Sequence, residues 1–132
     1  MSTYEMSGAD RIAHERSRQQ SDAERRTLQG DLQYPPGTLA MAGLCYTLFA
    51  ASSPTMRNAL RPAVPFSGHW PWDEQYWKPG DDNSYACRIR ELEKAGALIA
   101  AEIDALLEHQ RLGHPLEPEN ARLNPHLYGW PQ

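Results

Sequence analysis

Cysteine is scarce in this sequence, whose 132 residues include two, Cys45 and Cys87. Two thiols cannot supply the four ligands of a structural zinc site, and a small domain stapled by disulfides would hold more of them. Both lie among small or apolar neighbours, so we expect buried free thiols. The N-terminus has no basic segment followed by an apolar one, so no signal peptide is expected and a reducing cytoplasm is the expected compartment.

Long apolar runs and an excess of positive charge are also missing. The longest apolar stretch, residues 39–51, is shorter than the roughly 20 residues that a membrane-spanning helix needs, so no membrane partner is expected. The formal net charge is −4, and acidic residues are interspersed among the basic ones at 11–18 and 25–26. This balance argues against non-specific binding of nucleic acids but is compatible with a local basic pocket for a small anion.

Catalytic and metal-binding signatures are absent from the sequence. It contains no Walker loop, no GxGxxG turn, no GxSxG elbow and no HExxH helix. The five histidines show no ligand spacing on one helix, so no metal site is expected. Cys45 lies in the most apolar segment, where burial makes a thiol unreactive. We therefore expect no catalytic residues and no cofactor, and the sequence favours a binding protein over an enzyme.

Helical signals dominate the chain, and no long stretch alternates with a period of two residues. Residues 9–26 are polar and rich in helix formers, whereas 38–51 are apolar on nearly every side and predict a buried central helix. A long helix is predicted over 84–112, after a capping sequence and before Gly113. We expect one all-α domain over residues 1–132, a small helical bundle with a loose tail at 1–8, a helical core at 9–112 and an extended, proline-rich C-terminal arm at 113–132.

Helix 84–112 also predicts a homo-oligomer, most simply a dimer. Its apolar residues recur at spacings of three and four, typical of a helical seam, at Ile89, Leu92, Gly96, Ile99, Ile103 and Leu106. A second apolar strip, Ala95, Leu98, Ala101 and Ala105, lies beside it. The central helix can cover one strip but hardly both, and a large uncovered apolar surface favours association, most often about a two-fold axis.

The segment between the two apolar helices is rich in proline, glycine and aromatic residues. Its prolines exclude a long helix or a central strand, and its aromatic residues indicate order. Within it, residues 69–79, here called the Trp loop, carry four aromatic rings in eight residues. An indole that stacks on a nucleobase contributes about 1–3 kcal/mol. The alternative is that these indoles fill the gaps of a small helical core.

The candidate ligand-binding residues come from the Trp loop and from the helix after it. They are Trp70, Trp72, Asp73, Tyr76, Trp77, Lys78, Arg88 and Lys94. The rings would stack on a base, Asp73 and Lys78 would add an acceptor and a donor, and Arg88 or Lys94 would pair with a phosphate. Glu91 and Lys94 have the spacing of a simple ion pair, and Glu102 is expected to be half buried, either as a functional carboxylate or in a structural hydrogen bond.

Four motifs give the chain a family resemblance. They are E-R-x-R-Q at residues 15–19, G-x-L-A-x-A-x-x-C-Y at 37–46, a W-P-W-D-x-x-W-W-K-P pattern at 70–79, and K-A-G-A-L-I-x-A-E-I at 94–103. The chain resembles an uncharacterised family of small phage and prophage proteins in these motifs. It departs from the pattern at Tyr76, which replaces the first tryptophan of a pair, and at 21–33, which lacks an acidic, histidine-containing stretch.

The resemblance and the residues together suggest three functions. The first is a non-enzymatic phage protein that binds a small nucleotide-like ligand, for example a counter-defence sponge that sequesters an immune signalling nucleotide in the cytoplasm of an infected or lysogenic bacterial host. The second is an all-α nucleotide pyrophosphohydrolase, for which Glu91, Glu102 and Asp104 are the suitably placed acids. The third is a protein-binding inhibitor or adaptor that uses the first helix and the C-terminal arm with Tyr128 and Trp130.

Overall fold

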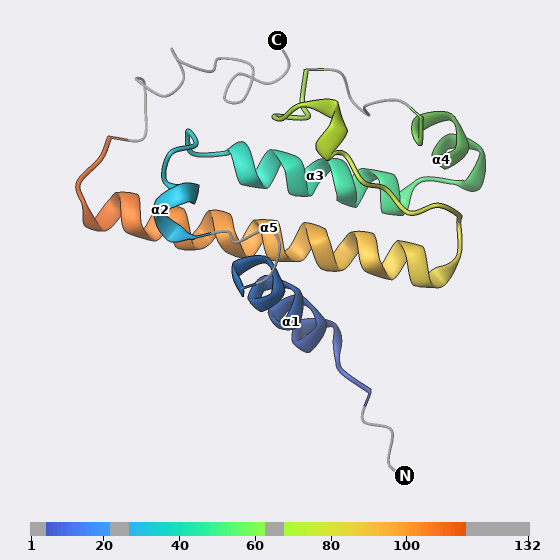
Figure 1. The fold of residues 1–132 in the computed structure, drawn as a ribbon, viewed down its shortest axis with the longest axis horizontal. Helices are drawn as coiled ribbons and strands as arrows, with labels where there is room; N and C mark the ends of the chain where they lie inside the picture. The colour runs from blue at the N-terminus through green and yellow to red at the C-terminus, as the bar shows by residue number, and fades with distance from the viewer. Residues whose placement is uncertain (1–4, 22–26, 63–67, 116–132) are drawn as a thin grey trace.

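The computed structural model describes residues 5–21, 27–62 and 68–115 (Figure 1). Within these residues the chain forms helices and no strand, which confirms the all-α prediction. The elements in chain order are α1 (Gly8–Ser21), α2 (Leu28–Asp31), α3 (Thr38–Ala51), α4 (Pro54–Leu60), the 3-10 helix η1 (Glu74–Tyr76) and α5 (Tyr85–Arg111). Beyond Pro115, the predicted C-terminal arm lies outside the described residues, as does the predicted part of the first helix after Ser21.

Helices α4 and α5 begin at serine caps, whereas α3 is capped from another helix. Ser53 and Ser84 accept hydrogen bonds from backbone N–H groups in the first turns of α4 and α5. Helix α3 follows Gly37, whose φ of 100° favours glycine and which offers no side-chain cap. Glu102 of α5 replaces that cap, since its carboxylate accepts from the backbone N–H groups of Gly37 and Ala40 at 3.0 Å each. The sequence left a structural and a functional role open for Glu102, and the structure shows the structural hydrogen bonds.

Helices α3 and α5 lie side by side and antiparallel, and they form the centre of the fold (Figure 1). Their contact is close because small residues meet there. A Cβ atom added at Gly43 would lie 3.1 Å from the carbonyl oxygen of Ala95. The buried apolar core combines both helices with the Trp loop, and it contains Leu39, Ala42, Cys45, Tyr46, Phe49, Trp70, Trp77, Ala95, Leu98 and Ala101.

Of the two apolar strips on α5, helix α3 covers the one that is rich in alanine. Ala95, Leu98, Ala101 and Ala105 are buried. The seam that the sequence analysis singled out remains at the surface, where its large members are exposed by 37% to 53%. The sequence predicted that α3 would leave one strip uncovered, and the structure identifies which one.

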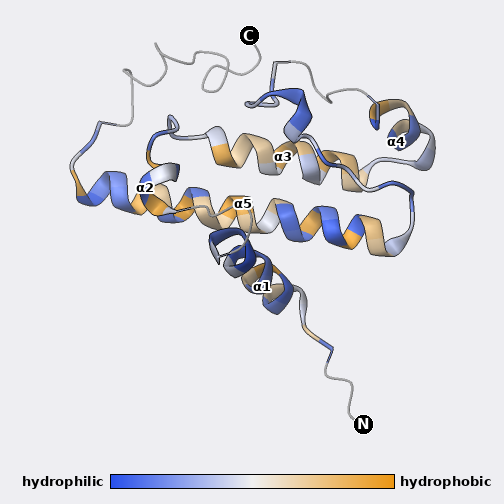
Figure 2. Cartoon of the chain, viewed as in Figure 1, coloured by the Kyte–Doolittle hydropathy of each residue, from blue (hydrophilic) through white to orange (hydrophobic). Residues whose placement is uncertain are grey.

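Helix α1 packs against another side of α5, and most of the contact is polar. Arg11, Glu15 and Arg16 pair with residues of α5 at N–O distances of 3.2, 2.6 and 3.2 Å. Figure 2 shows the contrast in hydropathy, with α1 mostly hydrophilic and α3 mostly hydrophobic. Among the described helices, none has the length and apolar character to cross a membrane.

A buried ion pair joins α4 to α5. Arg57 is 0% exposed and Glu91 is 1% exposed. The two Nη atoms of Arg57 donate to the two carboxylate oxygens of Glu91 at 2.5 and 2.9 Å. The spacing of Glu91 and Lys94 suggested a pair between these two side chains, and this is corrected, because Lys94 donates to the carbonyl oxygen of Lys78 instead. No local pattern signalled Arg57, which lies 34 residues before its partner.

Candidate ligand-binding pocket

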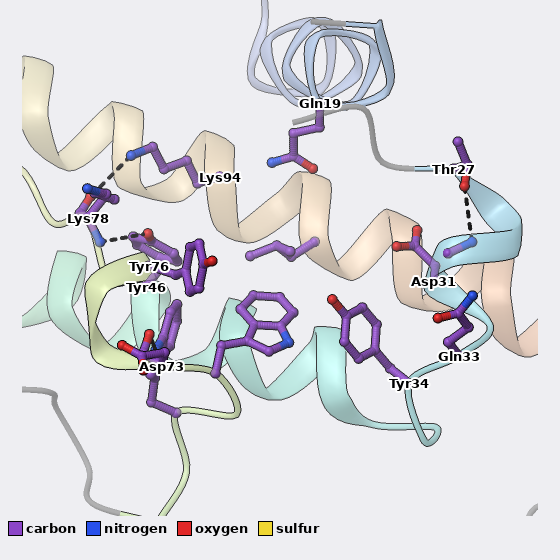
Figure 3. Close-up of a pocket in the computed structure, with 14 residues that line it drawn as sticks. Gln19, Thr27, Asp31, Gln33, Tyr34, Tyr46, Asp73, Tyr76, Lys78 and Lys94 are labelled. Carbon is purple, nitrogen blue, oxygen red and sulfur yellow. Dashed lines mark hydrogen bonds between the residues drawn. The ribbon is translucent and has the colours of Figure 1, made fainter. Parts of the chain in front are cut away.

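A pocket of about 830 Å³ opens beside the Trp loop (Figure 3). Its walls come from α1, α2, the segment between α2 and α3, α3, the Trp loop and α5. This volume lies within the range of small-molecule sites, about 300–1,000 Å³. The lining residues are Gln19, Thr27, Gly30, Asp31, Gln33, Tyr34, Tyr46, Trp70, Trp72, Asp73, Tyr76, Lys78, Lys94 and Leu98.

Aromatic rings form the middle of the pocket. Trp72 meets Trp70 edge-to-face at 5.5 Å between ring centroids and lies tilted against Tyr34 at 5.6 Å. Trp70 is fixed in turn, because its Nε1 donates to the carbonyl oxygen of Asp73 at 3.1 Å. Tyr76 is exposed beside them. The site therefore has a wall of packed rings and one exposed ring.

The four rings of the Trp loop divide between core and pocket. Trp77 is buried between Tyr46, at 4.7 Å between centroids, and Phe49, at 5.6 Å. Trp70 is also buried, but it lines the pocket, as Trp72 and Tyr76 do. Core packing is thus confirmed for Trp70 and Trp77, and three of the four rings line a cavity, so the binding interpretation stays a prediction.

Tyr46 holds the end of the Trp loop against α3. Its hydroxyl accepts a hydrogen bond from the backbone N–H of Lys78 at 3.1 Å, and the Nζ of Lys94 lies 5.5 Å from the centroid of its ring. Lys94 also donates to the carbonyl oxygen of Lys78 at 3.1 Å. The two lysines are therefore neighbours, and they are the chain's only lysines. Figure 3 shows them together at one end of the pocket, with Asp31 and Gln33 at the other and the rings between.

Gln19 reaches the pocket from α1 and is 3% exposed. Its Nε2 donates to Glu15 at 3.1 Å, which leaves its Oε1 buried without a hydrogen-bond partner among the described residues. Burial raises the pKa of Glu15, but hydrogen bonds from Arg18 and Arg90 outweigh it and hold that pKa at about 2. Glu15 is thus a charged anchor for Gln19. Buried amide oxygens normally accept a hydrogen bond, so this oxygen is suited to a donor on a ligand.

Two of the predicted site residues do not reach the pocket. Trp77 lies in the core, as described above. The side chain of Arg88, which belongs to α5, reaches the C-terminal end of α3, where its Nη1 donates to the carbonyl oxygens of Ala50 and Ser52 at 2.8 and 2.9 Å. There it satisfies carbonyl groups that a helix end leaves without intrahelical partners. The other six predicted residues, Trp70, Trp72, Asp73, Tyr76, Lys78 and Lys94, line the pocket together.

Sequence reasoning missed the other eight lining residues of the pocket, among them Gln19, Asp31 and Tyr34. Tyr34 precedes two prolines and Gly37, which direct the chain into α3. Gln19 ends the first of the four motifs described above, and this was the available signal for it. Asp31 lies in α2, a four-residue helix that begins at the side-chain cap of Thr27.

The acids considered for a hydrolase do not converge. Glu91 pairs with Arg57, Glu102 caps α3, and Asp104 is paired with Arg16 at 3.2 Å. Across the described ranges, no group of three or more His, Cys, Asp or Glu side chains is placed to hold a metal ion. The pocket described here therefore contains aromatic rings, two lysines and two separate aspartates, Asp31 and Asp73, but no cluster of carboxylates.

Comparisons with protein-family models, with curated proteins and with solved structures found no match to this chain, and its interpretation depends on its own residues.

Proposed function

We propose that the pocket binds a small nucleotide-like ligand with a flat ring and an anionic group, and that the protein sequesters this ligand without converting it. The observation that carries the proposal is the order of groups along the cavity. The two lysines of the chain lie at one end of the cavity, aromatic rings line its middle, and Gln19 reaches it from α1 with a buried amide oxygen that has no hydrogen-bond partner among the described residues. Each part suits one part of a nucleotide.

The base would stack on an open face of Trp72 rather than enter between two rings. A ring inserted between two others needs about 7 Å between their centroids, because stacked carbon atoms lie roughly 3.5 Å apart. Trp72 and Tyr34 are 5.6 Å apart and Trp72 and Trp70 are 5.5 Å apart, so neither gap admits a base. Tyr76, which is exposed and lines the pocket, would cover the other face of the bound ring.

The polar groups would bind the polar parts of the ligand. The Oε1 of Gln19 accepts a hydrogen bond, so it favours a base that presents an exocyclic amine or a ring N–H. Lys78 and Lys94 are cations that pair with phosphate oxygens. A net charge of −4 keeps polyanions away from the rest of the surface, which favours a small ligand over a nucleic acid.

The phage resemblance suggests where such binding would matter. In an infected or lysogenic bacterial host, a protein that holds a signalling nucleotide without hydrolysing it lowers the free concentration of that signal. This role needs affinity and abundance but no catalytic group. The dispersed acids of this chain are compatible with it.

Calorimetry against cyclic dinucleotides and ADP-ribose derivatives tests the proposal. We expect at least one of them to bind with a Kd below about 100 μM, equivalent to roughly −5.5 kcal/mol. No binding in that range to any member of the panel would contradict the proposal. Phosphate release from nucleoside triphosphates with magnesium separates binding from hydrolysis, since turnover that is lost on Glu102→Ala substitution would favour an enzyme.

Chemical labelling locates the ligand. Acetylation of primary amines followed by mass spectrometry reports on Lys78, Lys94 and the N-terminal amine alone, because the chain has no other lysine. We expect the ligand to slow labelling of both lysines several-fold and to leave the N-terminal amine, the internal control, unchanged. Equal labelling rates with and without bound ligand would place the ligand elsewhere.

A further inference from the structure

The described residues cover two sides of helix α5, one apolar and one mostly polar. Helix α3 packs on the alanine-rich strip, and α1 packs on the side that carries Arg90, Glu93 and Asp104. The third side is the seam that begins at Tyr85. Its large members, here called the α5 stripe, are exposed by 37% to 87% and are Tyr85, Ile89, Leu92, Ile99, Ile103 and Leu106.

The α5 stripe is long and carries no charge. From Tyr85 to Leu106 it extends for about 32 Å, at a rise of roughly 1.5 Å per residue. The spacing along it alternates strictly between four and three residues when Gly96 is included. A sustained alternation of this kind is the pattern of helices that pair with another helix.

The pattern of the stripe is symmetric about Gly96. Ile89 and Ile103 lie seven residues on either side of it, and Leu92 and Ile99 lie four and three residues away. An antiparallel copy of α5 would therefore place Ile89 opposite Ile103 and Leu92 opposite Ile99. Every large apolar residue of the stripe then meets another one, as a closed two-fold axis requires.

The neighbouring helices supply the edges of such an interface. A helix about 32 Å long and roughly 10 Å wide provides only the centre of the about 800 Å² that each partner of a standard interface buries. Ile12 of α1 lies over Gly96, since a Cβ atom added at Gly96 would be 2.5 Å from the Cδ1 of Ile12. On the other side, Gly43 of α3 lies close to Ile99, whose Cγ1 would be 3.3 Å from a Cβ atom added at Gly43. Ile12 therefore covers Gly96, and at the midpoint of the stripe the surface open to a partner is formed by Ile12 together with Ile99 beside α3.

We propose that two copies of this chain form an antiparallel dimer through the α5 stripe, with the two-fold axis near Gly96, where Ile12 of each copy would lie in the interface. The ligand pockets face away from this interface. Lys94, which lines the pocket, follows Leu92 of the stripe by two residues, and two residues turn a helix by about 200°. Each chain therefore keeps a complete pocket, and the dimer does not depend on the function proposed above.

Light scattering of the full chain at micromolar concentration tests the assembly. We expect twice the mass of one chain, which is 14.9 kDa. Ile99→Asp should reduce the mass to that of one chain and retain the helical circular dichroism spectrum. Met56→Asp, which places the same charge on an exposed apolar residue of α4, should leave the dimer intact. A single-chain mass for the unsubstituted protein at these concentrations would overturn the proposal.

Cross-linking tests the antiparallel register, in a Cys87→Ser background that removes the partly exposed native thiol. Ile89→Cys and Ile103→Cys chains should form little disulfide-linked dimer when each is oxidised alone. When the two are mixed, we expect at least a several-fold gain in linked dimer. Efficient linkage of each variant with itself would instead indicate a parallel pair and overturn the register. A monomer that dimerises only after removal of residues 116–132 would show that the chain's own C-terminal segment occupies the stripe, and would overturn the proposal as well.

Discussion

Removal of Arg57 is expected to destabilise the fold strongly, because this residue connects four parts of the chain. Besides its two contacts with Glu91, its Nη1 donates to the carbonyl oxygen of Phe49 at 3.1 Å. Its Nη2 donates to the carbonyl oxygen of Asp82 at 2.7 Å and its Nε to Asn83 at 2.8 Å. Arg57→Met preserves much of the buried volume but removes all five hydrogen bonds.

The size of the stability loss in Arg57→Met follows from the partners that Glu91 keeps. Glu91 would keep one partner, the backbone N–H of Gly80 at 2.9 Å, and would otherwise be a buried carboxylate without its cation. Loss of one member of a buried ion pair typically costs about 3–5 kcal/mol. In the double variant Arg57→Met with Glu91→Met no buried charge is left, and the remaining cost comes from the backbone groups that lose their partners. We therefore expect the double variant to lose at least about 2 kcal/mol less than the sum of the two single variants.

Urea unfolding followed by circular dichroism measures the free energies of unfolding of the four proteins in this cycle. Met56→Ala, an exposed neighbour on α4, is the matched control and should change the free energy of unfolding by no more than about 0.5 kcal/mol. If the loss of unfolding free energy in the double variant equals the sum of the two single losses to within about 0.5 kcal/mol, the two side chains are not coupled and the reasoning is refuted.

Three further predictions concern single side chains. The pKa of Glu15 is about 2 in the folded protein against an ordinary 4.5, so its contribution to stability is present above pH 4.5 and is lost as the pH falls through 2. In urea titrations between these pH values, a Glu15→Gln variant should lose less stability than the unsubstituted protein. Equal losses of stability would contradict the assignment. Burial raises the pKa of the Cys45 thiol to about 12, so a thiol reagent at pH 8 should modify only Cys87 in the folded chain and both cysteines in urea; two fast thiols without urea would count against it. Glu102→Ala removes the acceptor at the start of α3 and should cost about 1–3 kcal/mol by urea unfolding, whereas a cost below about 0.5 kcal/mol would show that the cap is dispensable.

The helices themselves were predictable because their signals are local. The central helix was predicted from apolar composition at 38–51 and is observed at Thr38–Ala51. A capping sequence was predicted at residues 81–84, and its last residue, Ser84, is the cap of α5. Such signals depend on neighbours within a few residues, so a single sequence suffices to detect them.

The packing of these helices was not predictable to the same degree. Both apolar strips of α5 are visible in the sequence. Which of them faces α3 depends on how closely the two helices can approach each other. Gly43 approaches the backbone of Ala95 closely, and this contact requires small residues on both helices. The partners of the buried charged residues were not predictable either. Glu91 and Glu102 looked like candidates for chemistry, and their partners, Arg57 and the backbone at Gly37, are 34 and 65 residues away in the chain.

The candidate site was predictable from its composition but not from its geometry. The density of rings in residues 69–79 indicated a binding surface, and six of the eight predicted residues line one pocket. Arg88 was included because it follows the loop closely in sequence, yet its guanidinium binds carbonyl groups at the end of α3. Gln19 approaches from α1 and Tyr34 from the segment between α2 and α3, and the sequence alone could not place either beside the loop.

The most direct test of the account is the affinity of the pocket with and without the ring of Trp72, measured by calorimetry for the tightest nucleotide of the panel. Loss of one base–aromatic stack is worth about 1–3 kcal/mol, so Trp72→Ala should raise Kd by roughly 5- to 150-fold, and Trp72→Phe should recover part of it. Thermal melts of both variants establish that they are folded, and Met56→Ala serves as the control with unchanged affinity. A folded Trp72→Ala protein that binds the nucleotide as tightly as the unsubstituted chain would contradict the claim that this pocket is the binding site.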